Sequence, residues 1–187
     1  METMINGIYK TSHGLKVIKI FGYATKGIPG LEIHGSSKIN RSVKEKIIYL
    51  TRMRKLKIPM KRYVICLDTN ELESTNSHEL KWLEFPILLV YWQLAGLLPI
   101  RKLDDCITSG TVSVDGVINH LNYPVHFHQQ LEEYFSDYEI QNVKLIGSSS
   151  NQINQFYFID TSLLLEHIKK IQIQKNMANI RMVQQTG

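Results

Sequence analysis

The residues whose charge could bind a ligand form a basic segment in the first third of the chain. From Lys38 to Arg62 the sequence contains ten lysines or arginines and a single acid, Glu45. Such a concentration attracts phosphate groups, and each phosphate that it neutralises makes binding more sensitive to salt. Only Tyr49 and Tyr63 could stack on bases here, so we expect contact with a nucleic-acid backbone rather than reading of base sequence. The residues predicted to make this contact are Lys38, Arg41, Lys44, Arg52, Lys55, Lys61 and Arg62.

Two other interpretations of the basic segment stay open. Most charge runs in soluble proteins are solvated faces that maintain solubility. The same cations could also bind an acidic protein surface. The formal net charge of +5 at pH 7 is compatible with all three interpretations, because net charge informs on association and not on fold.

Histidines and cysteines are the residues that could hold a metal. His126 and His128 would face the same way on a strand, and His120 precedes them; imidazole is a common zinc ligand. No Asp, Glu or Cys lies beside this group, and a half-buried strand edge explains the spacing as well. Cys66 and Cys106 stand alone without Cys-x-x-Cys spacing, which is typical of small buried side chains. We therefore predict no metal site.

A helix is expected to position the basic residues. Ser36 or Ser37 is a suitable N-cap, and the helical pattern continues to about Leu56. At about 100° per residue, one side of this helix is apolar and is predicted to face the core. That side carries Ile39, Val43, Ile47, Leu50 and Met53. The opposite side carries Lys38, Arg41, Lys44, Arg52 and Lys55, together with Glu45, Ile48 and Leu56.

Strands are predicted on both sides of this helix. Leu15 to Thr25 alternates roughly between polar and apolar residues and is rich in β-branched and aromatic side chains, as strands are. The turn from Gly27 to Gly30 follows, because glycine tolerates positive φ and proline fixes its own φ, and LEIHG is then a short strand. After Pro59, the apolar run from Arg62 to Asp68 predicts a buried strand.

The rest of the chain supplies a core helix, a hairpin and a closing helix. Leu83 to Leu98 is apolar nearly all round, which predicts a buried helix with Pro86 in its first turn. Asp115 and Gly116 mark the turn of a hairpin. The predicted ranges are the hairpin at 107–121, a short helix at 130–138, a strand at 143–147 and a helix from Asp160 or Thr161 to about residue 175. This mixture predicts the α+β class, with a mixed sheet packed with helices.

Length and composition favour a single domain. The chain has 187 residues, of which 43% are hydrophobic, enough for one core. We expect the domain to cover residues 1–175, and residues 176–187 to form a polar tail that is frayed or acts as a linker. The first residues lack the pattern of a secretory signal, and the longest apolar run, Phe85 to Leu98, is too short to span a bilayer. A cytoplasmic protein outside the membrane is therefore expected.

Several blocks of the sequence resemble the N-terminal domain of the Mg-chelatase-like ComM/YifB proteins. GIPGLEIHGSSKINRSVKEKI is similar to the family's Gly-Leu-Pro-Gly-Phe segment and the helix after it. IPMKRYVICLD is similar to a family strand that begins Phe-Pro-x-x-Arg, with Pro59 and Arg62 matching. LEFPILL, SGTVSVDG and FIDTSLLLEHI stand where the family has a Leu-Pro-Ile block, a Leu-Asp-Gly block and a closing Ser-Leu-Leu-Glu block. The resemblance extends from about Ile8 to Ile173.

The resemblance implies a Lon-protease-like domain, of the fold shared with the second domain of a small-ribosomal-subunit protein. In the ComM/YifB family this domain precedes an AAA+ ATPase, and the whole proteins look like DNA-processing machines. Related Lon-like domains form ring-shaped assemblies. The implied partners are therefore DNA, an AAA+ ATPase or further copies of the chain. The Gly-x-x-x-x-Gly-Lys-[Ser/Thr] phosphate cradle does not occur in the sequence, so we expect no ATP bound through a P-loop and no other cofactor.

The same resemblance bears on peptidase activity, because Lon peptidases activate a serine nucleophile with a lysine. Counting along the resemblance places the serine position at Glu84 and the lysine position near Val125, so we predict a non-catalytic domain. A divergent peptidase that uses Ser74 or Ser77 with Lys81 is the alternative, and a structural remnant without a partner is a third possibility. Glu84 is expected either to cap a helix, where the N-terminal dipole favours a carboxylate, or to keep a role in an inherited pocket.

Overall fold

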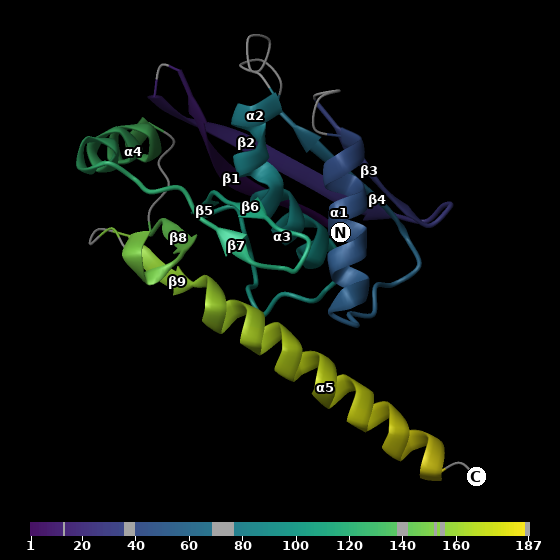
Figure 1. Cartoon of the computed structure of the whole chain (residues 1–187). Helices are drawn as coiled ribbons and strands as arrows, with labels where there is room; N and C mark the ends of the chain where they lie inside the picture. The colour runs from purple at the N-terminus through teal and green to yellow at the C-terminus, as the bar shows by residue number, and fades with distance from the viewer. Residues whose placement is uncertain are drawn as a thin grey trace.

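A mixed seven-stranded sheet forms the frame of the fold, with the strands in the order β3-β4-β2-β1-β5-β8-β9 (Figure 1). The computed structural model describes residues 1–12, 14–35, 40–68, 77–137, 142–151, 153 and 156–185. The strands of the sheet are β1 Glu2–Thr11, β2 Gly14–Thr25, β3 Gly30–His34, β4 Arg62–Leu67, β5 Cys106–Thr108, β8 Lys144–Gly147 and β9 Tyr157–Asp160. A two-stranded ribbon is formed by β6 Thr111–Val112 and β7 Ile118–Asn119. The predicted α+β class with a mixed sheet is confirmed.

Five α-helices and two short 3-10 turns surround this sheet in the part of the chain that the structure describes. They are α1 Asn40–Met53, α2 Ser77–Leu80, η2 Lys81–Leu83, α3 Glu84–Leu94, α4 Val125–Asp137, η3 Ser149–Asn151 and α5 Thr161–Gln185. None of the described helices is long and apolar enough to cross a membrane. The predicted strand Arg62–Asp68, the first helix and the strand at 143–147 agree with β4, α1 and β8 within a few residues at their ends.

The central strand β1 was not expected from the sequence. It pairs with β2 in antiparallel and with β5 in parallel, although Asn6 and Gly7 in its middle are poor strand formers. Tertiary contacts explain both residues. The Asn6 side-chain amide donates to the Cys106 carbonyl at 3.2 Å, and a Cβ at Gly7 would lie only 2.9 Å from Leu83 Cδ2. The strand is therefore fixed by its neighbours rather than by its own propensity.

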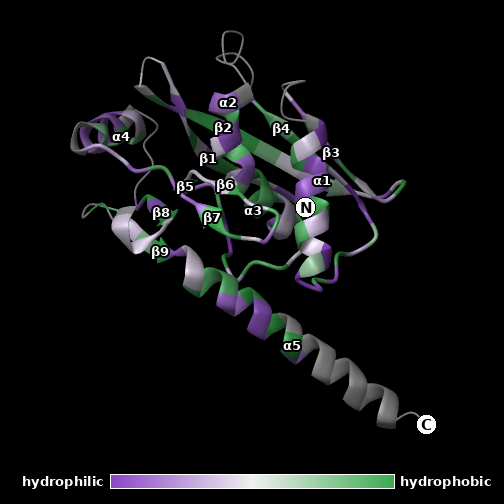
Figure 2. Ribbon diagram, viewed as in Figure 1, coloured by the Kyte–Doolittle hydropathy of each residue, from purple (hydrophilic) through white to green (hydrophobic). Residues whose placement is uncertain are grey.

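Helix α3 lies in the core, as predicted. All eleven of its residues are buried, and Figure 2 shows it mostly in the hydrophobic colour. It packs against β1 and β2, where a Cβ on Gly22 would lie 2.8 Å from the Val64 carbonyl oxygen and 3.0 Å from Val90 Cγ1. Glycine at this position lets the helix approach the sheet closely, and the core depends on that approach.

Helix α4 belongs to a second apolar cluster, which includes Ile8 of β1 and Ile107 of β5. Its buried side chains Phe127, Leu131 and Phe135 follow at four-residue intervals, the spacing of one helix face. The structure therefore contradicts the expectation of a strand around His126 and His128. On a helix, positions two residues apart are separated by about 200°, so they do not face the same way.

Two further segments differ from expectation. The predicted hairpin at 107–121 is confirmed at β6 and β7, but its first residues form β5 of the large sheet. Helix α5 does not end near residue 175; its backbone continues to Gln185 and extends past the rest of the fold (Figure 1). The predicted cap at its start is confirmed, because Asp160 Oδ1 accepts from the backbone N–H groups of Ser162 at 2.8 Å and Leu163 at 3.2 Å. Strand β9, just before this helix, was not predicted.

Candidate nucleic-acid interface

The core fixes which side of α1 faces outward. Val43, Ile47 and Leu50 are buried, as predicted, and α1 packs on β3. Met53 is 42% exposed, so the expected apolar stripe stops one turn earlier; Ile39 lies outside the residues whose side chains the structure describes. Figure 2 shows α1 with hydrophilic and hydrophobic residues on different sides. This packing leaves the basic side of the helix exposed.

Two clefts flank the turn between β2 and β3, and predicted cations line both. The first turn cleft, of about 540 Å³, is lined by the turn itself together with Lys26, Lys44, Arg62 and one acid, Glu32. The second turn cleft, of about 350 Å³, includes Arg52 and Lys61. Pro29, Gly30 and Leu31 border both clefts. The turn from Gly27 to Gly30 thus lies between two clefts that are lined by cations.

Apolar side chains project at the same place. Ile28 at the tip of the turn is 88% exposed, and Met60, beside the second turn cleft, is 82% exposed. Gly27 has a φ of 152°, which supports the turn as predicted, whereas Gly30 does not have the positive φ that the sequence suggested. Strand β3 then pairs in parallel with β4. The turn therefore reaches the edge of the sheet, where a large ligand has access.

Not every predicted cation is available for a ligand. Arg62 donates to Glu32 from Nε to Oε1 and from Nη2 to Oε2, each at 2.8 Å, and this pairing lowers the pKa of Glu32 to about 2. Its charge is thereby largely neutralised. By contrast, no ion pair with a described carboxylate is found for Lys26, Lys44, Arg52 or Lys61. These four residues are named the turn cations below.

Two other predicted contact residues, Arg41 and Lys55, do not line the turn clefts. Arg41 is exposed on α1 but lines neither turn cleft, and Lys38 lies outside the described residues. Lys55 comes after the end of α1 and lines a different cavity, so its predicted place on the helix is wrong. Lys26, which the sequence analysis missed because it precedes the basic segment, joins the site through the fold of the turn.

The two aromatic side chains predicted to be able to stack on bases differ in their exposure. Tyr63 is buried, donates from its hydroxyl to the Pro59 carbonyl at 2.8 Å, and packs edge-to-face on Tyr91 with ring centroids 5.2 Å apart. Burial raises the pKa of Tyr91 to about 12. Tyr49 is 55% exposed. Of the two predicted stacking residues, Tyr63 is therefore unavailable to a base.

Glu84 has a structural role that neither expectation included. Its buried side chain accepts from Lys46 Nζ at 2.6 Å and from the backbone N–H of Val112 at 2.8 Å. Glu84 is the first residue of α3, the place where the helix dipole was expected to favour a carboxylate, although its hydrogen bonds go to Lys46 and Val112. The carboxylate instead joins α1, α3 and the β6–β7 ribbon, and it removes Lys46 from the basic surface. The backbone of Val125 begins α4, and its side chain is outside the described part.

The residues of the alternative peptidase site are only partly described. Ser74 lies outside the described residues, and so does the side chain of Ser77. Lys81 Nζ lies 3.0 Å from His78 Nε2 and 5.9 Å from the centroid of the Trp82 ring. The neighbours of Lys81 that are described are thus an imidazole and an indole.

His120 takes part in a buried hydrogen-bond network. Its Nδ1 lies 2.7 Å from the Ser109 carbonyl oxygen, and its Nε2 lies 3.0 Å from Thr161 Oγ1. Because a carbonyl only accepts, Nδ1 carries the proton and Nε2 accepts from the threonine hydroxyl. Ser109 Oγ is also 2.7 Å from the Tyr123 hydroxyl. Among the described residues no group of His, Cys, Asp and Glu could hold a metal.

The stability of the fold is expected to fall as the pH drops below about 6.5, the usual pKa of histidine. Burial lowers the pKa of His120, against the opposing effects of the Ser109 carbonyl and the Asp160 charge. The unfolded chain therefore takes up a proton first, and stability is lost between pH 6.5 and the lower pKa of the folded state. Urea unfolding at pH 7.5, 6.5 and 5.5 measures this loss. His120→Asn should show a flatter dependence, and identical slopes would contradict the assignment.

Comparison with known families and proteins gives no relative from which a function could be taken. No family model matches the chain, and no curated protein matches it at a significant level. Evidence on function therefore comes from the residues of the chain and from their geometry.

Proposed function

We propose that this chain is a non-catalytic Lon-like domain that binds the sugar-phosphate backbone of nucleic acid through the surface around the β2–β3 turn. The observation that carries the proposal is that the turn cations line two adjoining clefts and form no ion pair with a described carboxylate, while Glu32, the acid in the described lining, is paired with Arg62. Phosphates are the ligands that such an arrangement of lysine and arginine attracts. The Lon-like part of the proposal is supported by the resemblance of the sequence blocks and by the α+β architecture.

The apolar side chains that project beside the turn cannot read a base sequence. Ile28 and Met60 carry no strong hydrogen-bond donor or acceptor that could bind a base edge. Glu84, at the position that the resemblance gives to the nucleophile, is held by Lys46 and Val112. Because both oxygens of this carboxylate are engaged in linking three elements of the fold, the Glu84 side chain supports a binding domain rather than a hydrolase. Partnership with an AAA+ ATPase rests on the resemblance alone, whereas the nucleic-acid contact is also supported by the turn cations.

Changing all four turn cations to glutamate is expected to reduce binding of a labelled 20-base-pair DNA duplex by at least about 100-fold at 50 mM NaCl. Fluorescence anisotropy measures the affinity. For the unchanged protein, the logarithm of the affinity should fall with the logarithm of salt concentration with a slope of about −3 to −4, since each neutralised phosphate contributes about 0.9. The same titration with duplex RNA tests whether the contact depends on the type of sugar.

A matched control separates the site from the overall charge. Lys10, Lys16, Arg101 and Lys170 are exposed, and changing them to glutamate alters the net charge by the same amount. Lys10 and Lys16 lie at the other end of the β1–β2 pair from the turn. This control should retain affinity within about fivefold. Equal losses in both variants, or no binding by the unchanged protein at 50 mM NaCl, would refute the proposed function.

A further inference from the structure

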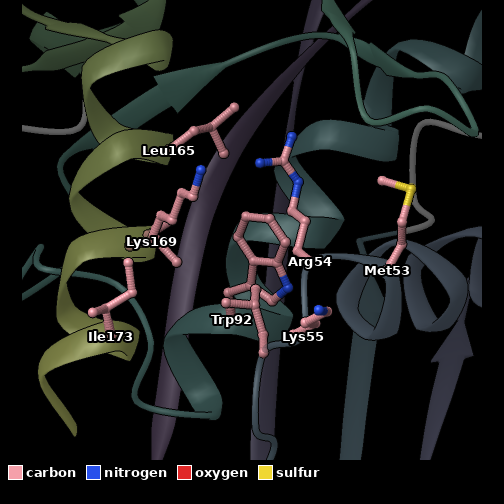
Figure 3. A pocket seen from close by; sticks show the side chains of 9 residues that line it. Met53, Arg54, Lys55, Trp92, Leu165, Lys169 and Ile173 are labelled. Carbon is pink, nitrogen blue, oxygen red and sulfur yellow. The ribbon is translucent and has the colours of Figure 1, made fainter. Parts of the chain in front are cut away.

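A cavity of about 410 Å³ lies between the end of α1, helix α3 and helix α5 (Figure 3). It is separate from the two turn clefts, although Leu56 borders both it and the second of them. Its volume is within the range of about 300–1,000 Å³ that is usual for small-molecule sites. Nothing in the proposed function uses this cavity.

The wall of the cavity is largely apolar. Leu56, Trp92 and Ile168 are buried in it, while Met53 and Ile173 are 42% and 50% exposed. The indole N–H of Trp92 donates to Thr51 Oγ1 at 3.0 Å, so the polar atom of the ring is satisfied and its apolar surface lines the space. Such a wall suits a hydrocarbon body, whose burial is favourable in proportion to the apolar area removed from water.

Positive charge surrounds this apolar wall. Arg54, Lys55 and Lys169 line the cavity, and among the described residues no acidic side chain does. In Figure 3 the guanidinium of Arg54 and the amino group of Lys169 lie toward the same end of the cavity. Apolar walls with cations at one end favour an amphipathic anion over a neutral or cationic molecule, because a carboxylate and a guanidinium form strong charge-assisted hydrogen bonds.

The position of Arg54 is fixed by the hairpin turn. Its Nη2 donates to the Gly116 carbonyl at 2.9 Å, and a Cβ at residue 116 would lie 2.9 Å from the same nitrogen. A guanidinium has five N–H donors, and no described carboxylate forms an ion pair with this one. Burial lowers the pKa of Arg54, which means that its charge is incompletely solvated. An anion in the cavity would compensate that charge.

Lys55 occupies a backbone position that normally belongs to glycine. Its φ is 54°, and the bonds from Lys55 N to Arg52 O at 2.8 Å and from Leu56 N to Thr51 O at 3.0 Å form a Schellman motif at the end of α1. A side chain is unfavourable in this left-handed conformation, and strained residues of this kind cluster at ligand sites. The strained residue here is a cation that lines the cavity.

We propose that this cavity binds a medium-chain carboxylate, with the hydrocarbon chain against Trp92 and Ile168 and the carboxylate toward Arg54 and Lys169. The ligand is recognised by two features together, the apolar wall and the cationic end. This inference does not depend on the nucleic-acid proposal, since the turn cations line other clefts.

The test titrates the full-length Trp82→Phe variant with decanoate below its micelle concentration. The sequence has two tryptophans, so the remaining fluorescence then comes from Trp92 in the cavity wall. The change in Trp92 fluorescence should saturate as the concentration of decanoate rises. Decanol, of the same length without charge, should bind at least about tenfold more weakly, the loss expected for charge-assisted hydrogen bonds. Decyltrimethylammonium should not bind. Equal affinity for all three ligands, or no saturation with decanoate, would overturn the proposal.

Substitutions of the cations that line the cavity test which of them bind the carboxylate. Arg54→Gln combined with Lys169→Gln should weaken decanoate binding to the level of decanol and leave decanol unaffected. Lys55→Gly should keep or raise the melting temperature, because glycine relieves the left-handed strain, and it should leave the preference for decanoate over decanol in place. The ligand series on the unchanged cavity decides the matter even if a variant folds poorly. Release of a dimer by decanoate would instead identify the cavity as a site for a second copy, and the proposal would be wrong.

Discussion

Replacing Glu84 with alanine is expected to lower the free energy of unfolding by about 3 kcal/mol. The buried carboxylate accepts from Lys46 at 2.6 Å and from the Val112 N–H at 2.8 Å. Alanine removes both acceptors, and the ammonium that remains belongs to a side chain only 25% exposed. Buried donors without partners are costly, because in the unfolded chain water satisfies them. Urea unfolding at pH 7, followed by tryptophan fluorescence, measures the loss.

A double-mutant cycle shows how much of this loss belongs to the ion pair. Glu84→Gln keeps an oxygen for Val112 but removes the negative charge, and Lys46→Met removes the ammonium. The double variant should lose less stability than the sum of the losses in the two single variants, and the difference, the coupling free energy, should be about 1–3 kcal/mol. As a control, Lys102→Met breaks the exposed pair with Asp104, whose expected contribution is within about 1 kcal/mol. A Glu84→Ala loss no larger than that of this control would contradict the role given to the pair.

Lys46 illustrates what the helical periodicity of α1 can predict and what it cannot. On a helix it lies about 40° from Leu50, within the apolar side of α1, so the pattern contained a charged residue that needed a buried partner. That partner is 38 residues away in the sequence, and no local rule identifies it. The apolar stripe itself was predictable because periodicity depends only on neighbours along the helix. Pairings across elements depend on the tertiary fold.

The candidate interface was predictable to the same extent. The sequence located the excess of cations, and Arg52, Lys44 and Lys61 do border clefts at one turn. It did not reveal that Glu32, on a neighbouring strand, neutralises Arg62, or that Lys26 completes the site. The first fact follows from the parallel pairing of β3 with β4 and the second from the pairing of Thr25 with Arg62 between β2 and β4, because these pairings place residues that are distant in sequence side by side. Charge composition alone does not contain this information.

The second large loss of stability is expected from a substitution at Gly22 in the sheet, where α3 packs against β2. Gly22→Val is expected to lower the free energy of unfolding by about 3 kcal/mol or more, through overpacking. A Cβ there would be 2.8 Å from the Val64 carbonyl oxygen, 3.0 Å from Val90 Cγ1 and 3.2 Å from Leu94 Cδ1. The carbonyl belongs to the adjacent strand and pairs with β2, so it cannot move without disturbing the ladder. Urea unfolding measures the loss.

Gly30→Val is the matched control, because it makes the same substitution in a strand of the same sheet. A Cβ at Gly30 meets nothing within 4 Å, and this residue does not have a positive φ. Valine at such a position should leave stability unchanged or raise it by up to about 1 kcal/mol, since it restricts the unfolded chain and favours the strand. If both variants lost similar stability, the effect would come from losing glycine in a strand, and not from the close approach of α3. If only Gly22→Val is destabilised, with the loss reduced by Val90→Ala, then the contact between helix and sheet is what requires glycine.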